Sequence, residues 1–208
     1  MLILLTFFGN NRLEAQLFKA GIVAGVSFAQ IEGDDVAGYS KFGANGGAIV
    51  AADINEKFLL SLEILYAQKG SASTISGRQQ GLVPSFRILH EYIEIPVVFQ
   101  YKDPKGMNFG VGLAPARHIR STFIDDFGME NPTYFEGVNT MPRWDFGGIF
   151  DLAYRLNDFS AINLRLTASL FPYQERFSVN RQTVIGQFNN SITLRYMFLV
   201  SAWREKRL

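Results

Sequence analysis

The chain has 208 residues, 48% of them hydrophobic and 14% aromatic by type, and its 20 Lys and Arg against 19 Asp and Glu leave a formal net charge of +1. This near balance excludes a strongly basic field for nucleic acid, and the absence of cysteine excludes disulfides, thiolate metal sites and cysteine nucleophiles. Nineteen Gly and nineteen Phe against two His are typical of a β-sheet that meets lipid, and the length suits one domain or at most two.

The first 16 residues look like the end of a secretory signal peptide. Met1–Phe8 is apolar, but it is shorter than the about 20 residues that a membrane-spanning helix needs. A polar stretch follows and leads to a predicted cleavage point near Ala15 and Gln16. The alternative is a buried first strand. We predict residues 1–16 as a signal-peptide remnant, 17–200 as one β-barrel domain and 201–208 as a basic periplasmic tail.

Period-2 alternation of apolar and polar residues runs through almost all of the remaining chain. Strands in globular proteins average about 5–6 residues, whereas a tilted strand that crosses an outer membrane needs about 9–11. The sequence predicts eight long strands, at about 17–29, 41–54, 57–69, 87–101, 106–118, 142–155, 159–171 and 188–199. Pro96 and Pro115 lie within two of them, and we expect a bulge or a break at each because proline cannot donate to the sheet.

Short and long connections alternate along the predicted strands without exception. The tight turns are 55–56, 102–105 and 156–158, and the long connections are 30–40, 70–86, 119–141 and 172–187. Outer-membrane barrels show this alternation because every second connection is a short periplasmic turn and the others are external loops. The pattern predicts an all-β, eight-stranded antiparallel up-and-down transmembrane β-barrel with both termini on the periplasmic side.

Each predicted strand has one apolar face and one polar face. In a membrane barrel the apolar face meets lipid, and aromatic residues gather near its two ends. The residues that we predict to face lipid are Phe58, Leu60, Leu62, Ile64, Ile162, Leu164, Leu166 and Leu194. A soluble, lipocalin-like barrel would show the same alternation with the apolar face inside. The glycines of the polar face, such as Gly21, Gly47 and Gly110, favour the membrane barrel because an eight-stranded barrel has a narrow interior.

The polar face carries charges of both signs. If this face points inward, its charged groups must pair to offset the cost of desolvation. We predict an ion-pair network that fills the lumen, made of Lys19, Glu63, Glu94, Asp145, Asp151, Arg165 and Arg195. The alternative is an open, conducting channel.

Two motifs resemble those of the PorT-like outer-membrane β-barrel family of Bacteroidota. Residues 63–70 read EILYAQKG and residues 92–96 read YIEIP, which are similar to the family's ELLYSQKG and YLEIP patterns. The resemblance covers nearly the whole mature chain and implies an eight-stranded outer-membrane barrel. The namesake of the family takes part in protein secretion by the type IX system. The chain departs from the family pattern at residues 114–116, where Gly-Pro is more common, and in its ten residues after Phe198.

The last predicted strand ends in an aromatic pattern. Outer-membrane strands usually stop at a terminal aromatic residue that the assembly machinery reads, and Tyr196 and Phe198 supply that signal here. The basic tail that follows them is either an unordered end or a periplasmic handle for a partner.

The sequence holds no strong catalytic or metal-binding motif. With two histidines far apart in the sequence and no cysteine, we expect no metal site and no cofactor. His118 and Ser121 are the combination closest to the His and Ser of lipid A-modifying barrels, with Asp125 as a nearby carboxylate. His90 is expected to belong to the polar lumen.

We therefore expect a monomeric, non-enzymatic outer-membrane protein with a structural or interaction role through loops 70–86 and 119–141. Its expected partners are outer-membrane lipid, lipopolysaccharide, whose phosphates suit the arginines near the outer rim, and envelope or secretion-system proteins, with no nucleic acid. The alternatives are a component of a type IX secretion or other envelope complex, a lipid A-modifying enzyme, and a soluble barrel that binds a small apolar ligand.

Overall fold

The computed structural model describes residues 18–32, 38–73, 86–125, 127–131, 143–172, 178–179, 182–183 and 188–200. The predicted signal peptide 1–16 and basic tail 201–208 lie outside these ranges. Among the described residues, no helix is long and apolar enough to cross a membrane.

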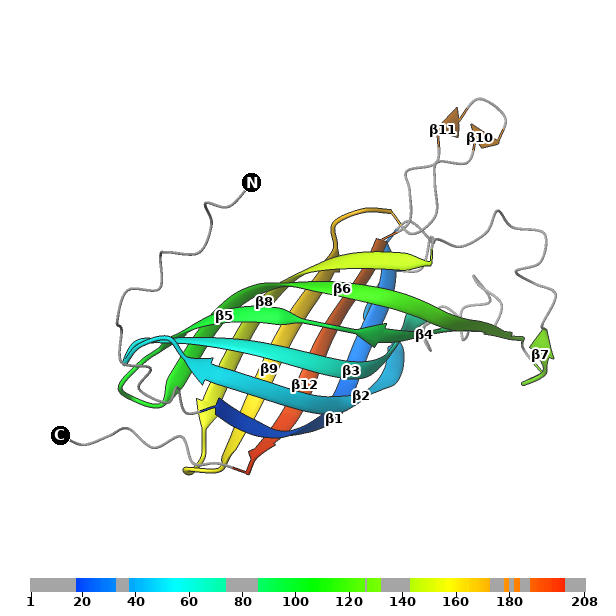
Figure 1. Ribbon diagram of the computed structural model, residues 1–208. Coiled ribbons are helices and arrows are strands. Elements are labelled where there is room, and N and C mark those ends of the chain that lie inside the picture. The colour runs from blue at the N-terminus through cyan, green and yellow to red at the C-terminus, as the bar shows by residue number, and fades with distance from the viewer. Residues whose placement is uncertain are drawn as a thin grey trace, which may run out of the picture.

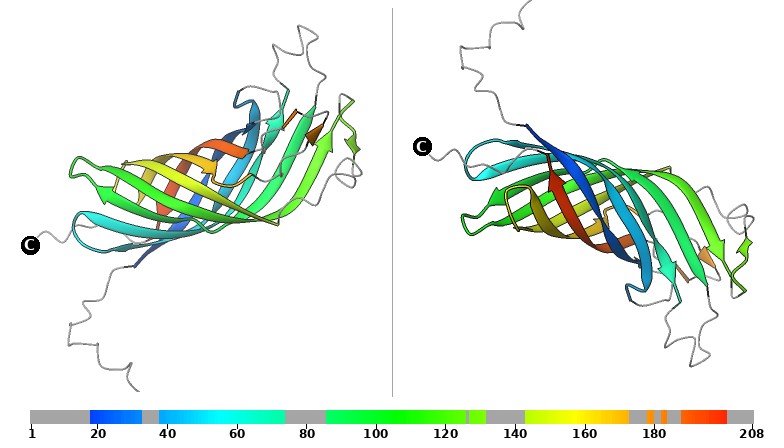
Figure 2. Two further views of the ribbon diagram at one scale, coloured as in Figure 1. Left: turned by 90° about the horizontal axis from the view of Figure 1, so that it is seen from above. Right: turned by 90° about the horizontal axis from the view of Figure 1, so that it is seen from below.

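The described strands form a closed, eight-stranded antiparallel barrel, which confirms the predicted fold class (Figures 1 and 2). Round the wall the strands are β1 (Phe18–Glu32), β2 (Lys41–Asp53), β3 (Phe58–Ala72), β4 (Arg87–Glu94) continued by β5 (Val97–Lys102), β6 (Met107–Ile124), β8 (Trp144–Arg155), β9 (Ser160–Ser169) and β12 (Phe188–Leu199). β12 pairs with β1 from Gly21↔Leu199 to Glu32↔Phe188, and this seam closes the sheet. In hydrocarbon a sheet must close in this way, because lipid offers no partners for edge N–H and C=O groups.

Three very short strands lie outside the barrel wall. β7 (Glu130–Asn131) pairs with the end of β6, and β10 (Ser178–Val179) pairs with β11 (Gln182–Thr183) in a small separate hairpin. All of them fall within segments that the sequence predicts as long loops.

The predicted tight turns all lie at one end of the barrel, which is called the turn end below; the opposite end is the loop end (Figure 1). Asn55 Oδ1 accepts hydrogen bonds from the backbone N–H groups of Lys57 and Phe58, each at 2.9 Å. Asn157 Oδ1 accepts one from Phe159 at 2.8 Å. Such side-chain contacts replace the ladder bonds that the chain loses where it reverses.

The two prolines lie near one another on neighbouring strands but affect their strands differently. The expected break occurs at Pro96, where β4 ends at Glu94 and β5 begins at Val97. The expected bulge at Pro115 is wrong, because β6 runs through it and pairs it with Phe146 of β8. The Pro115 carbonyl accepts a hydrogen bond from Ile95 N at 2.9 Å, so the side of Pro115 that has no donor faces the break. One interruption of the wall accommodates both residues.

Glycines sit where neighbouring strands approach most closely. A Cβ atom on Gly47 would lie 2.0 Å from the backbone oxygen of Ile64, and one on Gly21 would lie 2.2 Å from that of Phe198. The obstacle at these positions is therefore backbone of the adjacent strand. Small residues lie on the inward face, as predicted. The adjacent backbone requires them at Gly21 and Gly47, whereas at Gly110 an added Cβ would lie 2.9 Å from side-chain atoms of Gln100 and Val98 in the narrow interior.

Candidate functional site

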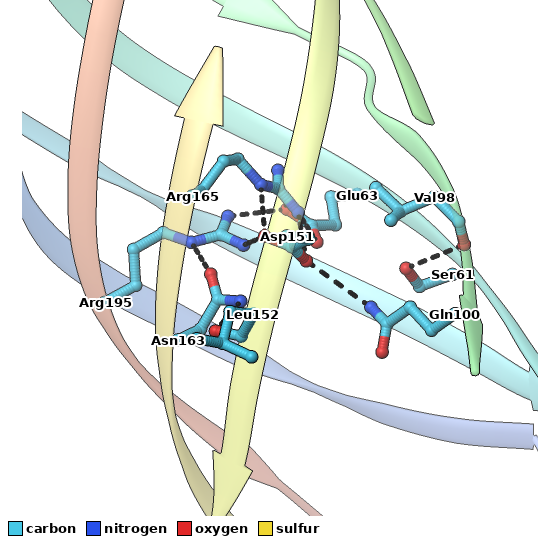
Figure 3. A network of polar contacts seen from close by, with 9 residues as sticks. All are labelled: Ser61, Glu63, Val98, Gln100, Asp151, Leu152, Asn163, Arg165 and Arg195. Atoms are coloured by element: carbon cyan, nitrogen blue, oxygen red, sulfur yellow. Dashed lines mark hydrogen bonds and ion pairs between the residues drawn. The ribbon is translucent and has the colours of Figure 1, made fainter. Parts of the chain in front are cut away.

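Four charged side chains from four strands meet inside the barrel (Figure 3). Arg165 of β9 donates from Nη2 to Glu63 Oε1 at 2.8 Å and from Nε to Asp151 Oδ1 at 3.0 Å. Arg195 of β12 donates from Nη1 to Glu63 Oε2 at 2.8 Å. These four side chains are at most 3% exposed. Two carboxylates and two guanidinium groups leave this central cluster without net formal charge.

The central cluster joins opposite walls of the barrel. β3 and β9 lie four positions apart in either direction round the eight-stranded wall, so the bidentate contact of Arg165 with Glu63 crosses the lumen. Asn163 accepts a hydrogen bond from Arg195 Nε at 2.8 Å and donates to the Leu152 carbonyl. Buried ion pairs offset desolvation only when geometry is good and further hydrogen bonds exist, and both conditions hold here.

A second cluster lies nearer the loop end. Lys69 Nζ is 2.8 Å from Glu94 Oε1 and 3.6 Å from Asp145 Oδ2. Ser169 Oγ donates to Asp145 Oδ2 at 2.9 Å, and the Lys69 ammonium lies 5.2 Å from the centre of the Tyr92 ring. The two carboxylates belong to the predicted lumen network, whereas Lys69 does not, although it has the same strand parity as Glu63.

A third cluster lies near the turn end and contains Lys19. Its ammonium contacts Asp53 at 2.5 Å, and Lys102 contacts the other oxygen of Asp53 at 2.7 Å. The seven residues of the predicted lumen network are thus all buried but are divided among three clusters. Asp53 and Lys102 complete the third cluster but are not in the predicted network, because both lie at the ends of their strands, where the alternation gives no clear face.

The two histidines of the chain meet at the loop end of the interior. Ser121 Oγ lies 2.7 Å from His90 Nδ1 and 2.7 Å from His118 Nε2. Thus the predicted His118–Ser121 contact is present, but the group on the other side of Ser121 is an imidazole, and Asp125 instead binds backbone N–H groups of its own turn. No group of three or more His, Asp or Glu within the described segments is arranged to hold a metal ion.

The residues predicted to face lipid lie on the outer surface. Ile64 is 58% exposed and Leu164 40% exposed, whereas Glu63 between Leu62 and Ile64 is 1% exposed. Phe58 is half-buried because it stacks on Phe99 at 5.1 Å. The remaining members are exposed as well, as are the two residues of the predicted assembly signal: Leu60, Leu62, Ile162, Leu166 and Leu194, with Tyr196 and Phe198. The apolar face therefore points away from the barrel axis.

Aromatic side chains border the exposed apolar surface at both ends. Phe58, Phe99 and Tyr101 pack together towards the turn end. Towards the loop end, Phe28 lies 4.8 Å from Phe42, and other pairs add to the border, namely Phe146 with Phe171 and Trp144 with the guanidinium of Arg117. Such belts are typical of the two interfaces of a membrane.

The rim arginines have different environments. Arg120 lies 3.9 Å from Glu91 and 3.7 Å from Glu130, so carboxylates already face it. Arg117 lies beside Trp144 on the outer surface, and Arg143 is exposed where β8 begins.

Comparisons with known proteins agree with this architecture. Residues 10–174 match the family described as outer membrane protein beta-barrel domain. No curated protein matches the chain. Neisserial surface protein A (NspA) is similar in structure, with a TM-score of 0.51, 9% sequence identity, and coverage of 87% of this chain and 96% of that one.

Two further solved structures match this chain over most of the length of both chains. Ail, the attachment invasion locus protein of Yersinia pestis, in complex with the heparin analogue sucrose octasulfate, has a TM-score of 0.49 and 9% identity over 88% of this chain and 98% of that one. The outer membrane protein AlkL in DMPC lipid bilayers has a TM-score of 0.35 and 13% identity over 90% and 93%. Because the family match spans most of the sequence, the chain belongs to the outer-membrane β-barrel domain family and is an outer-membrane barrel protein.

Proposed function

We propose that this protein is a non-enzymatic outer-membrane barrel whose lumen is closed by ion pairs, and that it has a structural or interaction role through its external loops. The observation that carries the proposal is the contact between Arg165 and Glu63, which crosses the lumen in a cluster of no net charge. An eight-stranded barrel has an interior just wide enough for side chains, so large side chains that meet in the middle leave little room for a solute.

Current through planar lipid bilayers tests the closed lumen. Wild-type protein, inserted from detergent, should give no steady conductance above leak. The double variant Glu63→Ala/Arg165→Ala removes the contact across the lumen and leaves Asp151 and Arg195, 3.8 Å apart, as a balanced pair. This variant should conduct more than wild type. Steady conductance of the wild-type protein itself would refute the proposal.

The topology supports a periplasmic location for both ends of the barrel domain. Phe18 pairs with Ala52 beside one tight turn, and Leu199 N donates to the carbonyl of Phe159 in another. Short turns of outer-membrane barrels face the periplasm. An epitope placed in the loop between β3 and β4 should therefore be labelled by antibody on intact cells, and one placed in the turn between β2 and β3 should not.

A role in a type IX secretion complex or another envelope complex is the second candidate, and the EILYAQKG and YIEIP motifs favour it. Co-purification of periplasmic or membrane proteins with the tagged barrel separates this role from a free-standing one.

A lipid A-modifying activity is the third candidate, and the contact between His118 and Ser121 favours it. Mass profiling of lipid A with and without the protein tests this activity. A change in acyl chains that His118→Ala abolishes would support the enzyme and refute the non-enzymatic proposal.

A further inference from the structure

The loop end of the barrel holds a histidine–serine–histidine arrangement that a closed structural barrel does not require. His90 comes from β4 and His118 and Ser121 come from β6, and each imidazole places one ring nitrogen 2.7 Å from the same hydroxyl. The two nitrogens are therefore at most 5.4 Å apart, twice that contact distance. These are both of the histidines in the whole chain.

A β-bulge creates the arrangement. In a regular strand, residues 118 and 121 would point to opposite faces, because side chains alternate with a period of two. Here Arg120 lies opposite Glu91 and His118 lies opposite Tyr92, so Ile119 is an extra residue in β6. Bulges re-aim side chains and are over-represented beside functional sites. The insertion turns His118 and Ser121 to the same side, where His90 meets them.

Two converging imidazole nitrogens suit a transition-metal ion. Metal–nitrogen bonds to histidine are about 2.0–2.1 Å long, so one ion can bridge nitrogens that are roughly 4 Å apart or closer. Reaching that separation from at most 5.4 Å needs a shift of roughly 0.7 Å or less in each ring. The Ser121 hydroxyl lies between the rings and can serve as an oxygen ligand.

We propose that His90 and His118 form a binding site for a divalent transition-metal ion, and that Cu²⁺ is bound most tightly of the common ions. Imidazole is a favoured ligand of copper, and the affinity of nitrogen sites along the first-row metals is highest for Cu²⁺. Because the protein supplies only two nitrogen ligands, the ion exchanges readily with solution.

Some charges around the site favour a bound cation and others oppose it. Lys69 is one cation of the lumen that acts on His90, but with Glu94 and Asp145 it forms a group of net charge −1, which favours a bound cation. Lys41 is a buried like charge that acts on His90 from β2, and its amine donates to the Phe42 carbonyl. Removing the charge of Lys41 should therefore strengthen metal binding.

A titration of tag-free protein with Cu²⁺, folded in detergent and followed by electron paramagnetic resonance, tests the proposal. The chain has no cysteine and two histidines, so imidazole nitrogen couplings in the spectrum can arise from this site alone. We expect one Cu²⁺ per chain with couplings from two imidazoles. His118→Gln and His90→Gln should each weaken binding by about tenfold or more, and Lys41→Gln should strengthen it by about twofold or more.

Heat-modifiable gel mobility shows that each variant is folded, and Ser121→Ala tests whether the hydroxyl is a ligand. Ser121→Ala removes the hydroxyl but keeps both rings, so it should retain coupling to two nitrogens. If His90→Gln does not fold, His118→Gln still tests the metal site, because His118 is only half-buried. Wild-type protein that binds Cu²⁺ no more tightly than the His118→Gln variant, or a spectrum without imidazole coupling, would overturn the proposal.

Discussion

Removing two opposite charges from the central cluster together should destabilise the barrel less than the sum of the two single removals. In Arg195→Met, Glu63 and Asp151 retain only Arg165, so one negative charge is left uncompensated. In Glu63→Gln, Arg165 and Arg195 share Asp151, so one positive charge is left. The double variant Glu63→Gln/Arg195→Met retains Arg165 and Asp151, whose Nε and Oδ1 atoms are 3.0 Å apart.

The size of the effect follows from burial. The side chains concerned are between 0% and 3% exposed, and removing one partner of a buried ion pair costs about 3–5 kcal/mol because a buried charge remains. Each single variant should therefore lose about that much free energy of unfolding. The double variant leaves no uncompensated charge, so its loss should be smaller than the sum of the two single losses by about 2–3 kcal/mol.

Urea unfolding in lipid vesicles, followed by gel mobility and tryptophan fluorescence, measures these losses. Trp144 is 52% exposed on the outer face and reports insertion into the bilayer. Glu56→Gln, in an exposed turn, is the control and should stay within about 0.5 kcal/mol of wild type. Losses that add within about 0.5 kcal/mol would show that the charges act independently, which would refute the reasoning.

Two further substitutions test the outer face and the wall. Leu62→Arg places a charge on the lipid-facing surface and should reduce the free energy of unfolding by about 2–4 kcal/mol in the same assay. Its control, Ile54→Arg in the turn, should reduce it by about 1 kcal/mol or less. Equal losses would contradict a lipid-facing Leu62. Gly47→Ala should reduce the heat-resistant, folded fraction on gels, because its Cβ would lie 2.0 Å from the Ile64 oxygen. Gly46→Ala, with its nearest contact at 3.1 Å, should fold nearly as wild type, and a fully folded Gly47→Ala would show that the strands can separate.

The strands of this protein could be predicted from the sequence because the two faces of each strand meet opposite environments. Leu62 and Ile64 are exposed while Glu63 is buried, and this contrast gives a strict period of two in the sequence. The signal weakens where the environment changes. β6 continues to Ile124, beyond the predicted end near residue 118. The extra residue Ile119 interrupts the period of two there, and polar residues follow it at 120–122, so the sequence signal ends before the strand does.

The grouping of the interior charges could not be predicted in the same way. Parity shows which side chains point inward, but the level of each along the axis depends on the register between strands. Arg165 meets Glu63, 102 residues earlier, while Lys19 lies at another level and contacts Asp53. The meeting of the two histidines is harder still, because an inserted residue at Ile119 reverses the parity and nothing in the local sequence marks it.

The three interior clusters together carry no net formal charge. The central cluster has no net formal charge, the cluster of Lys69, Glu94 and Asp145 has one negative charge in excess, and the cluster of Lys19, Asp53 and Lys102 has one positive charge in excess. The excess charges lie on opposite sides of the centre. The side chains of Asp53 and Lys102 are 27% and 17% exposed, so water screens the cluster near the turn end, whereas the side chains of the Lys69 cluster are at most 5% exposed. The central cluster is fully buried and fully balanced, whereas the cluster near the turn end has its excess charge where water reaches it. A side chain that breaks this balance at the centre should disturb the fold more than the same change at the turn end.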